Sequence, residues 1–486
     1  MKTFDAAESE KQTPSSSAAT STIDPEETSP GYNASTGIKC LVVFTTSFAT
    51  LTACFSSTSL FSAASQIAED YGTTSEIINA SSAGVLFTMG LSNFIWGPLI
   101  PLCGRLYTWN ACIVALFIWT LAASFAPNLK TFIVFRVLSG LQGTFFHVTG
   151  QAILAEYFPP VKRGTATGFF LCGTVLGPPM GPMIAGIITT YTTWRVILWV
   201  QCGMIGLGLT FSLIFLRHGG RPATIKKPLV KEVAALFSPM RVFSLMRYPN
   251  LFLTDLACGL LSWSQYALLS SPRHILVSQY GLTSPLISGL FYLSPAGGFL
   301  AGTLIGGRFS DRTVRRWMQN RNGLRLPQDR LRSGFISWFL VIPAASLIYG
   351  WGIEEHVGGL PLPIVFAFFT AAGILAAFAG LNTYCAEVMP LNRAEAIASK
   401  YLVQYSFSAL ASGIAVPLID AVGVGVQCTI SVVFVYVAGA LCVITALYGI
   451  NMQRWVDRRW PSAAQKSKQS EDEYDGPPLQ HVASAP

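Results

Sequence analysis

The stretch QCTISVVFVYVAGALCVITALYGI, residues 427–450, contains no charged side chain and is one of twelve separable apolar stretches between about Ile38 and Asn451. The hydrocarbon core of a bilayer is about 30 Å thick, so a helix needs about 20 apolar residues to cross it. Lipid cannot hydrogen-bond to the backbone, and each crossing must therefore be a complete helix or part of a closed barrel. The twelve stretches predict an all-α membrane protein with twelve transmembrane helices.

The expected spans form two groups of six, separated by a polar, basic loop. Those of the first group are 39–62, 77–100, 108–126, 131–156, 164–189 and 195–216. Those of the second group are 249–272, 283–306, 334–352, 361–383, 396–419 and 427–450. The predicted organisation is thus an N-terminal tail 1–37, a first half 38–216, a linker loop 217–248, a second half 249–452 and a C-terminal tail 453–486. Both tails are polar, and we expect them to be disordered.

The composition excludes an ordinary soluble enzyme. Of the 486 residues, 51% are hydrophobic and 12% are charged, whereas soluble domains carry about 25% charged residues. The chain has no G-x-x-x-x-G-K-[ST] loop for ATP, which argues against an ATP-driven pump. Its ten cysteines include no CxxC pair and have no accompanying His cluster. We therefore expect no enzymatic activity, no metal and no other cofactor.

The charged residues predict the orientation of the chain in the membrane. The formal net charge is +8, and loop 307–333 alone carries eight arginines. The opposite set of loops is acidic and contains Glu69, Asp70, Glu76, Glu354 and Glu355. Cytoplasmic loops of membrane proteins carry the excess of Lys and Arg, so the positive charge indicates topology rather than nucleic-acid binding. We expect both termini in the cytoplasm and the protein in the plasma membrane, with the vacuolar or another internal membrane as the alternative.

Three motifs, in order and at the expected spans, resemble the major facilitator superfamily, specifically its fungal twelve-span drug:proton antiporter branch. The fourth span contains RVLSGLQG, residues 136–143, which is similar to the family's R-x-x-x-G-x-x-G. The fifth span resembles the antiporter motif through Gly173, Gly177, Pro178, Gly181, Pro182 and Gly186. The loop after span eight resembles G-x-x-x-D-R-x-x-R-R through Gly307, Asp311, Arg312, Arg315 and Arg316. This resemblance implies two six-helix pseudo-repeats that expose a central site alternately to each side.

The first-half counterpart of that gating loop departs from the family pattern. Gly97, Gly104 and Arg105 are kept, but Pro101 and Leu102 stand where the family has Asp and Arg. In the family, that Asp helps to latch the closed inner gate. The departure implies that Asp311 carries more of this role.

Helical periodicity places polar residues of three spans on shared faces, as candidates for the substrate and proton pathway. Span four contributes Arg136, His147 and Gln151; span seven contributes Asp255, Ser262 and Tyr266; span eleven contributes Tyr401, Gln404, Tyr405 and Ser408. Ionisable residues within spans are rare and usually functional. Arg136 could bind an anion or tune a carboxylate, His147 could carry a proton, and Asp255 could couple proton movement to transport.

Each of these interpretations has a structural alternative. Arg136 could extend to the outer surface, His147 could hydrogen-bond a backbone carbonyl, and Asp255 could meet the basic loop near the cytoplasmic end of its span. The aromatic and hydroxyl groups of span eleven suit a cavity for an organic molecule, but they also suit ordinary helix packing.

The function that we expect is secondary active export of a small organic solute by proton antiport. Members of the fungal branch export organic acids such as itaconate, secondary metabolites and drugs. The partners would be the solute, protons and the lipid bilayer, with no nucleic acid, and the protein would be a monomer. An uptake proton symporter or uniporter of the same fold is one alternative, and a non-transporting membrane sensor is another.

Overall fold

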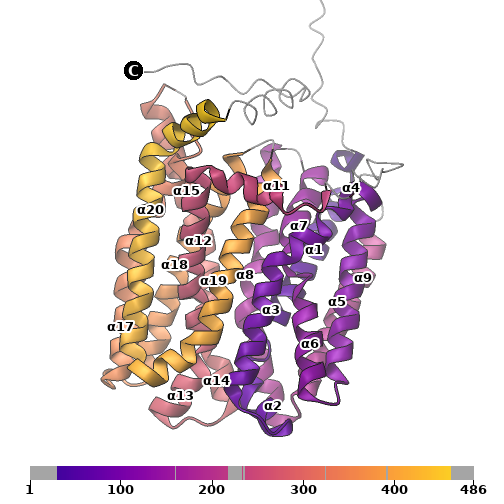
Figure 1. Cartoon of the computed structure of the whole chain (residues 1–486), viewed down its shortest axis with the longest axis vertical. Helices are drawn as coiled ribbons and strands as arrows, with labels where there is room; N and C mark the ends of the chain where they lie inside the picture. The colour runs from indigo at the N-terminus through magenta and orange to yellow at the C-terminus, as the bar shows by residue number, and fades with distance from the viewer. Residues whose placement is uncertain are drawn as a thin grey trace, which may run out of the picture.

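The helices form two bundles that lie side by side (Figure 1). The computed structural model describes residues 30–158, 160–216, 233, 236–322, 324–389 and 392–460. Most of linker loop 217–248 and nearly all of the two tails lie outside these residues, so the expectations for those segments are not addressed by the structure.

The first bundle contains the helices that precede the linker. They are α1 (Thr36–Thr58), α2 (Ala64–Asp70), α3 (Ser75–Trp96), α4 (Leu99–Cys103), α5 (Arg105–Ser124), α6 (Leu129–Gly140), α7 (Gly143–Tyr157), α8 (Pro160–Tyr191) and α9 (Arg195–Phe215). Short 3-10 turns, Pro30–Asn33 and Phe61–Ala63, precede α1 and α2.

The second bundle follows the linker. Its helices are α11 (Met240–Phe243), α12 (Pro249–Ser270), α13 (Pro272–Tyr280), α14 (Pro285–Phe291), α15 (Leu293–Asn320), α16 (Asp329–Arg332), α17 (Ile342–Glu354), α18 (Pro361–Glu387), α19 (Arg393–Val422) and α20 (Val424–Arg459). A 3-10 turn, Ser244–Arg247, follows α11, and a π-helical turn, Ser337–Val341, leads into α17.

The all-α prediction is confirmed, and each of the twelve expected ranges falls on helix. By length and hydropathy, ten described segments could cross a membrane. The two expected spans outside that set are α3 and α12, which have 22 residues each and are about 33 Å long at 1.5 Å per residue. Both pack against α19. Helices packed within a bundle tolerate polar residues that lipid-facing helices do not, and this accounts for their lower hydropathy.

Two expected features differ in detail. Span four is not one helix, because α6 ends at Gly140 and α7 begins at Gly143. The gating segment 307–316 is not a loop either: it lies within α15, which continues to Asn320. The segment from Arg308 to Asn320 contains no Gly or Pro, so nothing interrupts the helix as it leaves the apolar region.

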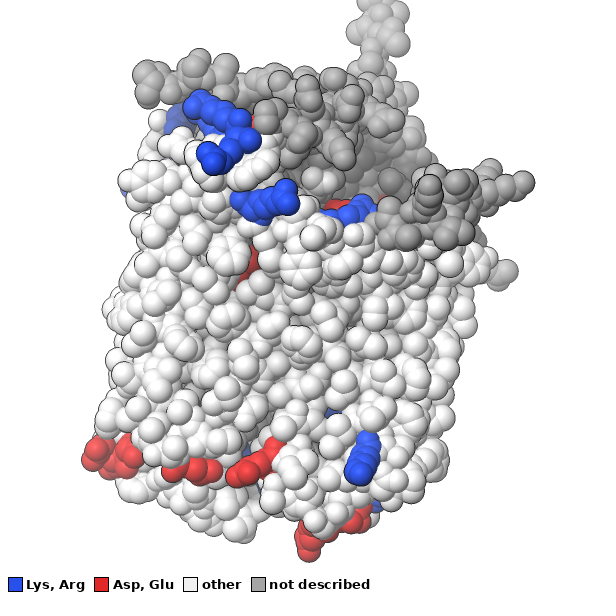
Figure 2. Space-filling view, viewed as in Figure 1, with Lys and Arg blue, Asp and Glu red and all other residues white. Residues whose placement is uncertain are grey.

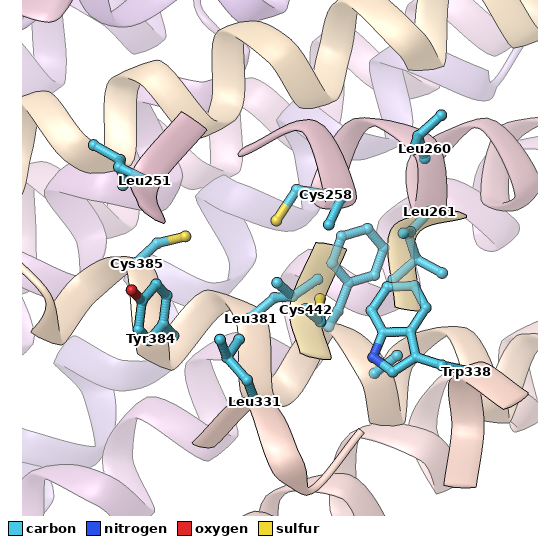
Figure 3. Close-up of a cluster of buried hydrophobic side chains, with 14 of the residues drawn as sticks. Leu251, Cys258, Leu260, Leu261, Leu331, Trp338, Leu381, Tyr384, Cys385 and Cys442 are labelled. Carbon is cyan, nitrogen blue, oxygen red and sulfur yellow. The ribbon is translucent and has the colours of Figure 1, made fainter. Parts of the chain in front are cut away.

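A buried cluster fills the centre of the second bundle (Figure 3). It joins α12, α16, α18 and α20 through residues that include Leu251, Leu331, Leu381 and Cys442. Trp338, at the turn before α17, is 1% exposed and packs into the same cluster. This core positions α12 and α18, which carry part of the candidate site.

Charge separates the two ends of the bundle (Figure 2). Basic side chains gather at the end where α11 and the C-terminal turns of α15 and α20 lie, which we call the basic end. Acidic side chains gather at the opposite end, beside α2, α13 and α14, which we call the acidic end. The charged residues of the loops predicted this separation of a basic from an acidic end.

Candidate functional site

Three glycines on successive turns of α8 bring that helix into close contact with α1. A Cβ added to Gly173 would collide with Ser47, and one added to Gly177 would collide with Cys54. A Cβ on Gly181 would lie 2.7 Å from Thr58 Oγ1 and 2.9 Å from Ser59 N. Small residues of this kind let membrane helices approach through their backbones.

Two hydroxyl groups, from α1 and from the turn that follows it, donate to backbone carbonyls of α8 beside its prolines. Pro182 has no N–H to donate to the carbonyl of Pro178 one turn earlier. Thr58 Oγ1 donates to that carbonyl instead, at 2.7 Å. Ser62 Oγ likewise donates to the carbonyl of Pro182 at 2.8 Å. α8 is one helix although Pro178, Pro179 and Pro182 lie inside it.

The last glycine of the antiporter motif contacts the other half of the molecule. A Cβ on Gly186 would lie 2.5 Å from Pro285 O and 2.7 Å from the Cα of Gly289. A Cβ on Gly289 would in turn lie 2.9 Å from Met183 O. The predicted motif therefore serves two contacts: three glycines face α1, and Gly186 brings α8 against α14 near the acidic end.

Arg136 lies in the interior of the first half. Its side chain is 1% exposed and does not extend to the surface. Nη1 donates to the carbonyl of Ser56 on α1 at 2.9 Å, while Nε and Nη2 have no hydrogen-bond partner among the described residues. A buried guanidinium with unused donors is suited to binding an anion or a carboxylate.

His147, one of the predicted proton carriers, links α1 to the second half. It is 2% exposed, and its Nε2 lies 3.4 Å from Cys54 Sγ. Its ring centroid lies 5.4 Å from that of Tyr401 on α19. Because Cys54 and Ser56 belong to one turn of α1, the side chains of His147 and Arg136 both end at that turn.

The structure brings the three predicted tyrosines together at a surface between the halves, which we call the seam. Tyr401 and Tyr405 have ring centroids 6.1 Å apart, and Tyr405 and Tyr266 have centroids 6.4 Å apart. All three are buried in one cluster with Val85 and Met89 of α3. The seam therefore consists of α3 from the first half and α12 and α19 from the second.

Asp255 is fully buried on α12. Its Oδ2 accepts a hydrogen bond of 2.7 Å from Ser399 Oγ on α19, and Cys385 Sγ on α18 lies 3.9 Å from Oδ1. Asp255 forms no ion pair with the described residues, unlike the buried carboxylates of Glu156 and Asp329. Its hydrogen-bond partners among the described residues thus belong to neighbouring helices of its own half.

Sequence reasoning missed Lys400, which adjoins both Ser399 and Tyr401. The side chain is 3% exposed. Nζ donates to Asn382 Oδ1 at 2.8 Å and lies 3.6 Å from the centroid of the Tyr401 ring. The signal was present, since Lys400 is an ionisable residue inside the expected span 396–419, and such residues are functional by default.

The remaining predicted pathway residues are less closely tied to this group. Ser262 is buried, and its hydroxyl has no partner among the described residues. Ser408 Oγ donates to the carbonyl of Gln404 at 2.9 Å, whereas Gln404 Oε1 is buried without a partner in the described part of the chain. Gln151 is half-buried on α7, and no contact ties it to the ring cluster.

At the basic end of the first half, the atypical gating segment forms one short helix and one ion pair. Gly97 follows α3, and Gly104 has φ +87° between α4 and α5, a conformation that favours glycine. Arg105 Nη1 then lies 2.5 Å from Glu156 Oε1 on α7. Pro101 and Leu102 lie within α4 and supply no charge.

The described residues of the second half also form ion pairs at this end. Arg330 Nη1 lies 2.7 Å from Asp311 Oδ1, and its Nη2 lies 3.3 Å from Glu387 Oε1. Arg325 also pairs with Glu387, at 2.7 Å. The other arginines of the motif, Arg312, Arg315 and Arg316, are exposed on α15, and Gly307 faces open space.

No group of three or more metal-ligating side chains occurs within the described ranges.

Comparison with known proteins agrees with this architecture. The family model of the Major Facilitator Superfamily matches residues 46–412. Efflux pump radE of Floropilus chiversii is 25% identical over 384 residues, which cover 74% of this chain and 71% of that protein. MFS-type transporter MFS19 of Alternaria alternata is 28% identical over 410 residues, covering 77% of this chain and 81% of that one.

Solved structures support the same fold. A bacterial homolog of the human lysosomal transporter Spinster has a TM-score of 0.61 at 15% identity, covering 86% of this chain and 99% of that chain. The xylose transporter XylE from E. coli has a TM-score of 0.61 at 12% identity, covering 85% and 97%. The chain therefore belongs to the major facilitator superfamily and is a membrane transporter rather than an enzyme.

Proposed function

We propose that this transporter exports a small organic anion in exchange for protons. The observation that carries the proposal is the set of ionisable side chains buried in or beside the seam without ion-pair partners among the described residues: Arg136, His147, Asp255 and Lys400. Charges buried at membrane depth are costly and mark solute or proton pathways.

The charge balance of this set favours an anionic solute. Arg136 and Lys400 carry positive charge, and His147 can gain it. Asp255 is the one carboxylate in the set. A solute carboxylate would neutralise part of the excess positive charge, which a cationic solute would increase.

Asp255 is the proposed proton site. Its carboxyl group is buried, and its partners are a hydroxyl and a thiol. A carboxyl in such a place can bind and release a proton as its access to water changes, without breaking an ion pair. Solute on the cationic groups and a proton on Asp255 would then occupy neighbouring parts of one site.

The direction of transport follows from three supports. The basic end belongs on the cytoplasmic side by the positive-inside rule, the relatives include a named efflux pump, and the α1–α8 contact has the residues of the antiporter motif. These supports favour solute leaving the cytoplasm as protons enter, and the plasma membrane is the location that we propose for this exchange.

The test begins with the solute. Metabolite profiling of the medium from cells with and without the gene identifies the compound whose export is lost, which we expect to be an organic acid. That compound is then offered to liposomes containing the purified protein. With antiport, an acidic lumen drives solute into the vesicles as protons leave.

Two results would contradict the proposal. Accumulation driven by an alkaline lumen would indicate proton symport, and flux that ignores the gradient would remove proton coupling altogether. Loss of a neutral or cationic compound from the medium would contradict the anionic class while leaving coupling open to the same vesicle assay.

A further inference from the structure

Lys400 is a buried cation with an environment built from three helices. Its ammonium donates to Asn382 on α18 and lies over the ring of its neighbour Tyr401 on α19. His147, from α7 of the first half, contacts the same ring. Because these elements belong to both halves, Lys400 lies where a solute held between the halves would be in reach.

The charge of Lys400 is not cancelled by direct contact with an acid. Among the described residues, no carboxylate oxygen lies within 4.0 Å of its Nζ. The buried carboxylate of Asp255 instead accepts a hydrogen bond of 2.7 Å from Ser399 Oγ. An amide oxygen and an aromatic face stabilise an ammonium only partly, so Lys400 retains the capacity to bind an anion.

The surroundings of Lys400 also indicate what such an anion is attached to. Tyr401, Tyr405 and Tyr266 form a continuous row of rings, with centroids 6.1 and 6.4 Å apart. Aromatic side chains bind flat apolar groups by stacking and edge contacts. Asn382, which accepts the hydrogen bond of the ammonium, is an exposed polar residue.

We propose that Lys400 is the carboxylate-binding residue of the site and that the tyrosine row holds a planar or aromatic body, so that the solute class is an aromatic carboxylate. This inference rests on the proposed function, because it assigns the substrate class of that transport site. Binding moves the ammonium from the face of Tyr401 to the carboxylate, where a charge-assisted hydrogen bond replaces a weaker cation–π contact.

The experiment compares three probes that share one ring and differ in charge: benzoate, benzamide and benzylamine. Equilibrium binding to the full-length protein in lipid nanodiscs is measured for wild type, Lys400→Gln and Lys400→Arg. We expect wild type to prefer benzoate. Lys400→Gln should weaken benzoate binding by at least about tenfold, as expected for loss of a charge-assisted hydrogen bond, and leave benzamide unchanged. Lys400→Arg should recover part of the loss.

Lys39→Gln is the matched control. Lys39 also donates to an oxygen, the Tyr32 carbonyl at 2.7 Å, and lies 6.0 Å from the centroid of an aromatic ring, Phe158. It lies near the start of α1, away from the seam, and its replacement should leave the affinity of all three probes unchanged.

Several outcomes would overturn the inference. These are no benzoate binding by wild type at millimolar concentration, a preference for benzamide or benzylamine, or equal benzoate affinity in wild type and Lys400→Gln. The wild-type preference decides the question even if Lys400→Gln fails to fold. Binding does not depend on proton coupling, so Lys400-dependent benzoate binding with gradient-independent flux would support this assignment and reject antiport.

Discussion

The two halves hold their buried charges in different ways. In the first half, Arg136 donates to a backbone carbonyl and His147 lies against a thiol, so no carboxylate accompanies them. In the second half, Asp255 accepts a hydrogen bond from Ser399 on α19. Lys400 is the next residue of that helix and donates to Asn382. Among the four buried ionisable residues of the proposed site, the one carboxylate, Asp255, thus lies in the second half together with Lys400.

The sharpest test of this division is Asp255→Asn, with the largest expected effect. The amide keeps the shape and can still hydrogen-bond Ser399, but it cannot exchange a proton. A gradient of roughly two pH units can drive about a hundredfold solute accumulation in a one-for-one exchange, and we expect the variant to lose nearly all of it. Solute uptake into vesicles with an acidic lumen measures this.

Asp420→Asn is the matched control for that experiment, since Asp420 is a half-exposed carboxylate on α19 that pairs with His274, away from Asp255. It should retain gradient-driven accumulation. Full accumulation by Asp255→Asn would place the proton elsewhere, with His147 as the next candidate.

Replacement of Arg136 tests the first half. Arg136→Ala removes the buried Nε and Nη2 donors that are proposed to bind the solute anion, and a hydrogen bond to a charged group has a net value of about 1.5–3 kcal/mol. We expect transport at low solute concentration to fall by roughly 10- to 100-fold, with partial recovery in Arg136→Lys. The initial rate of solute exchange in proteoliposomes is the readout. Equal loss in both variants would show that geometry rather than charge matters here.

A pair of threonines compares the helices of the two halves. Thr58→Val removes the hydroxyl that donates to Pro178 O, leaving a buried carbonyl without a donor, and should lower stability by about 1–3 kcal/mol. Thr303→Val is the counterpart in the second half, where the hydroxyl donates to a carbonyl of its own helix, Phe299 O. It should be nearly neutral, and thermal unfolding in detergent distinguishes the two. Similar losses would argue against the role assigned to Thr58.

The smallest effect is expected for Arg330→Gln at the basic end of the second half. This change breaks ion pairs with Asp311 and Glu387, but these partners have side chains 54% and 28% exposed. Such pairs contribute about 1 kcal/mol or less in water. The thermal unfolding temperature should fall less than it does in Thr58→Val. A larger fall would indicate that the ion pairs of Arg330 contribute strongly to the stability of this end.

Sequence alone predicted the helices well because lipid demands long apolar runs, and even the polar α12 had enough of them. It placed the end of α15 too early, since hydropathy detects where the apolar region stops and not where the helix ends. Arg136, His147 and Asp255 could be singled out as ionisable groups within spans. Lys400 was missed because the face of span eleven that was considered begins at Tyr401, one residue later.

The partners of these residues could not be predicted. Ser399 approaches Asp255 from 144 positions along the chain, and Thr58 approaches Pro178 from 120. Such pairs depend on which helices become neighbours and at what depth, and periodicity within one helix has no information on either.

The hydroxyl group of Thr58 has a consequence for biogenesis. During synthesis, α1 emerges long before α8, and α8 enters the membrane with three prolines and unsatisfied carbonyls. Such a helix is unstable in lipid until α1 packs against it. We therefore expect α1 to act as an internal chaperone, and the first half to remain prone to degradation until its fifth span has paired with its first.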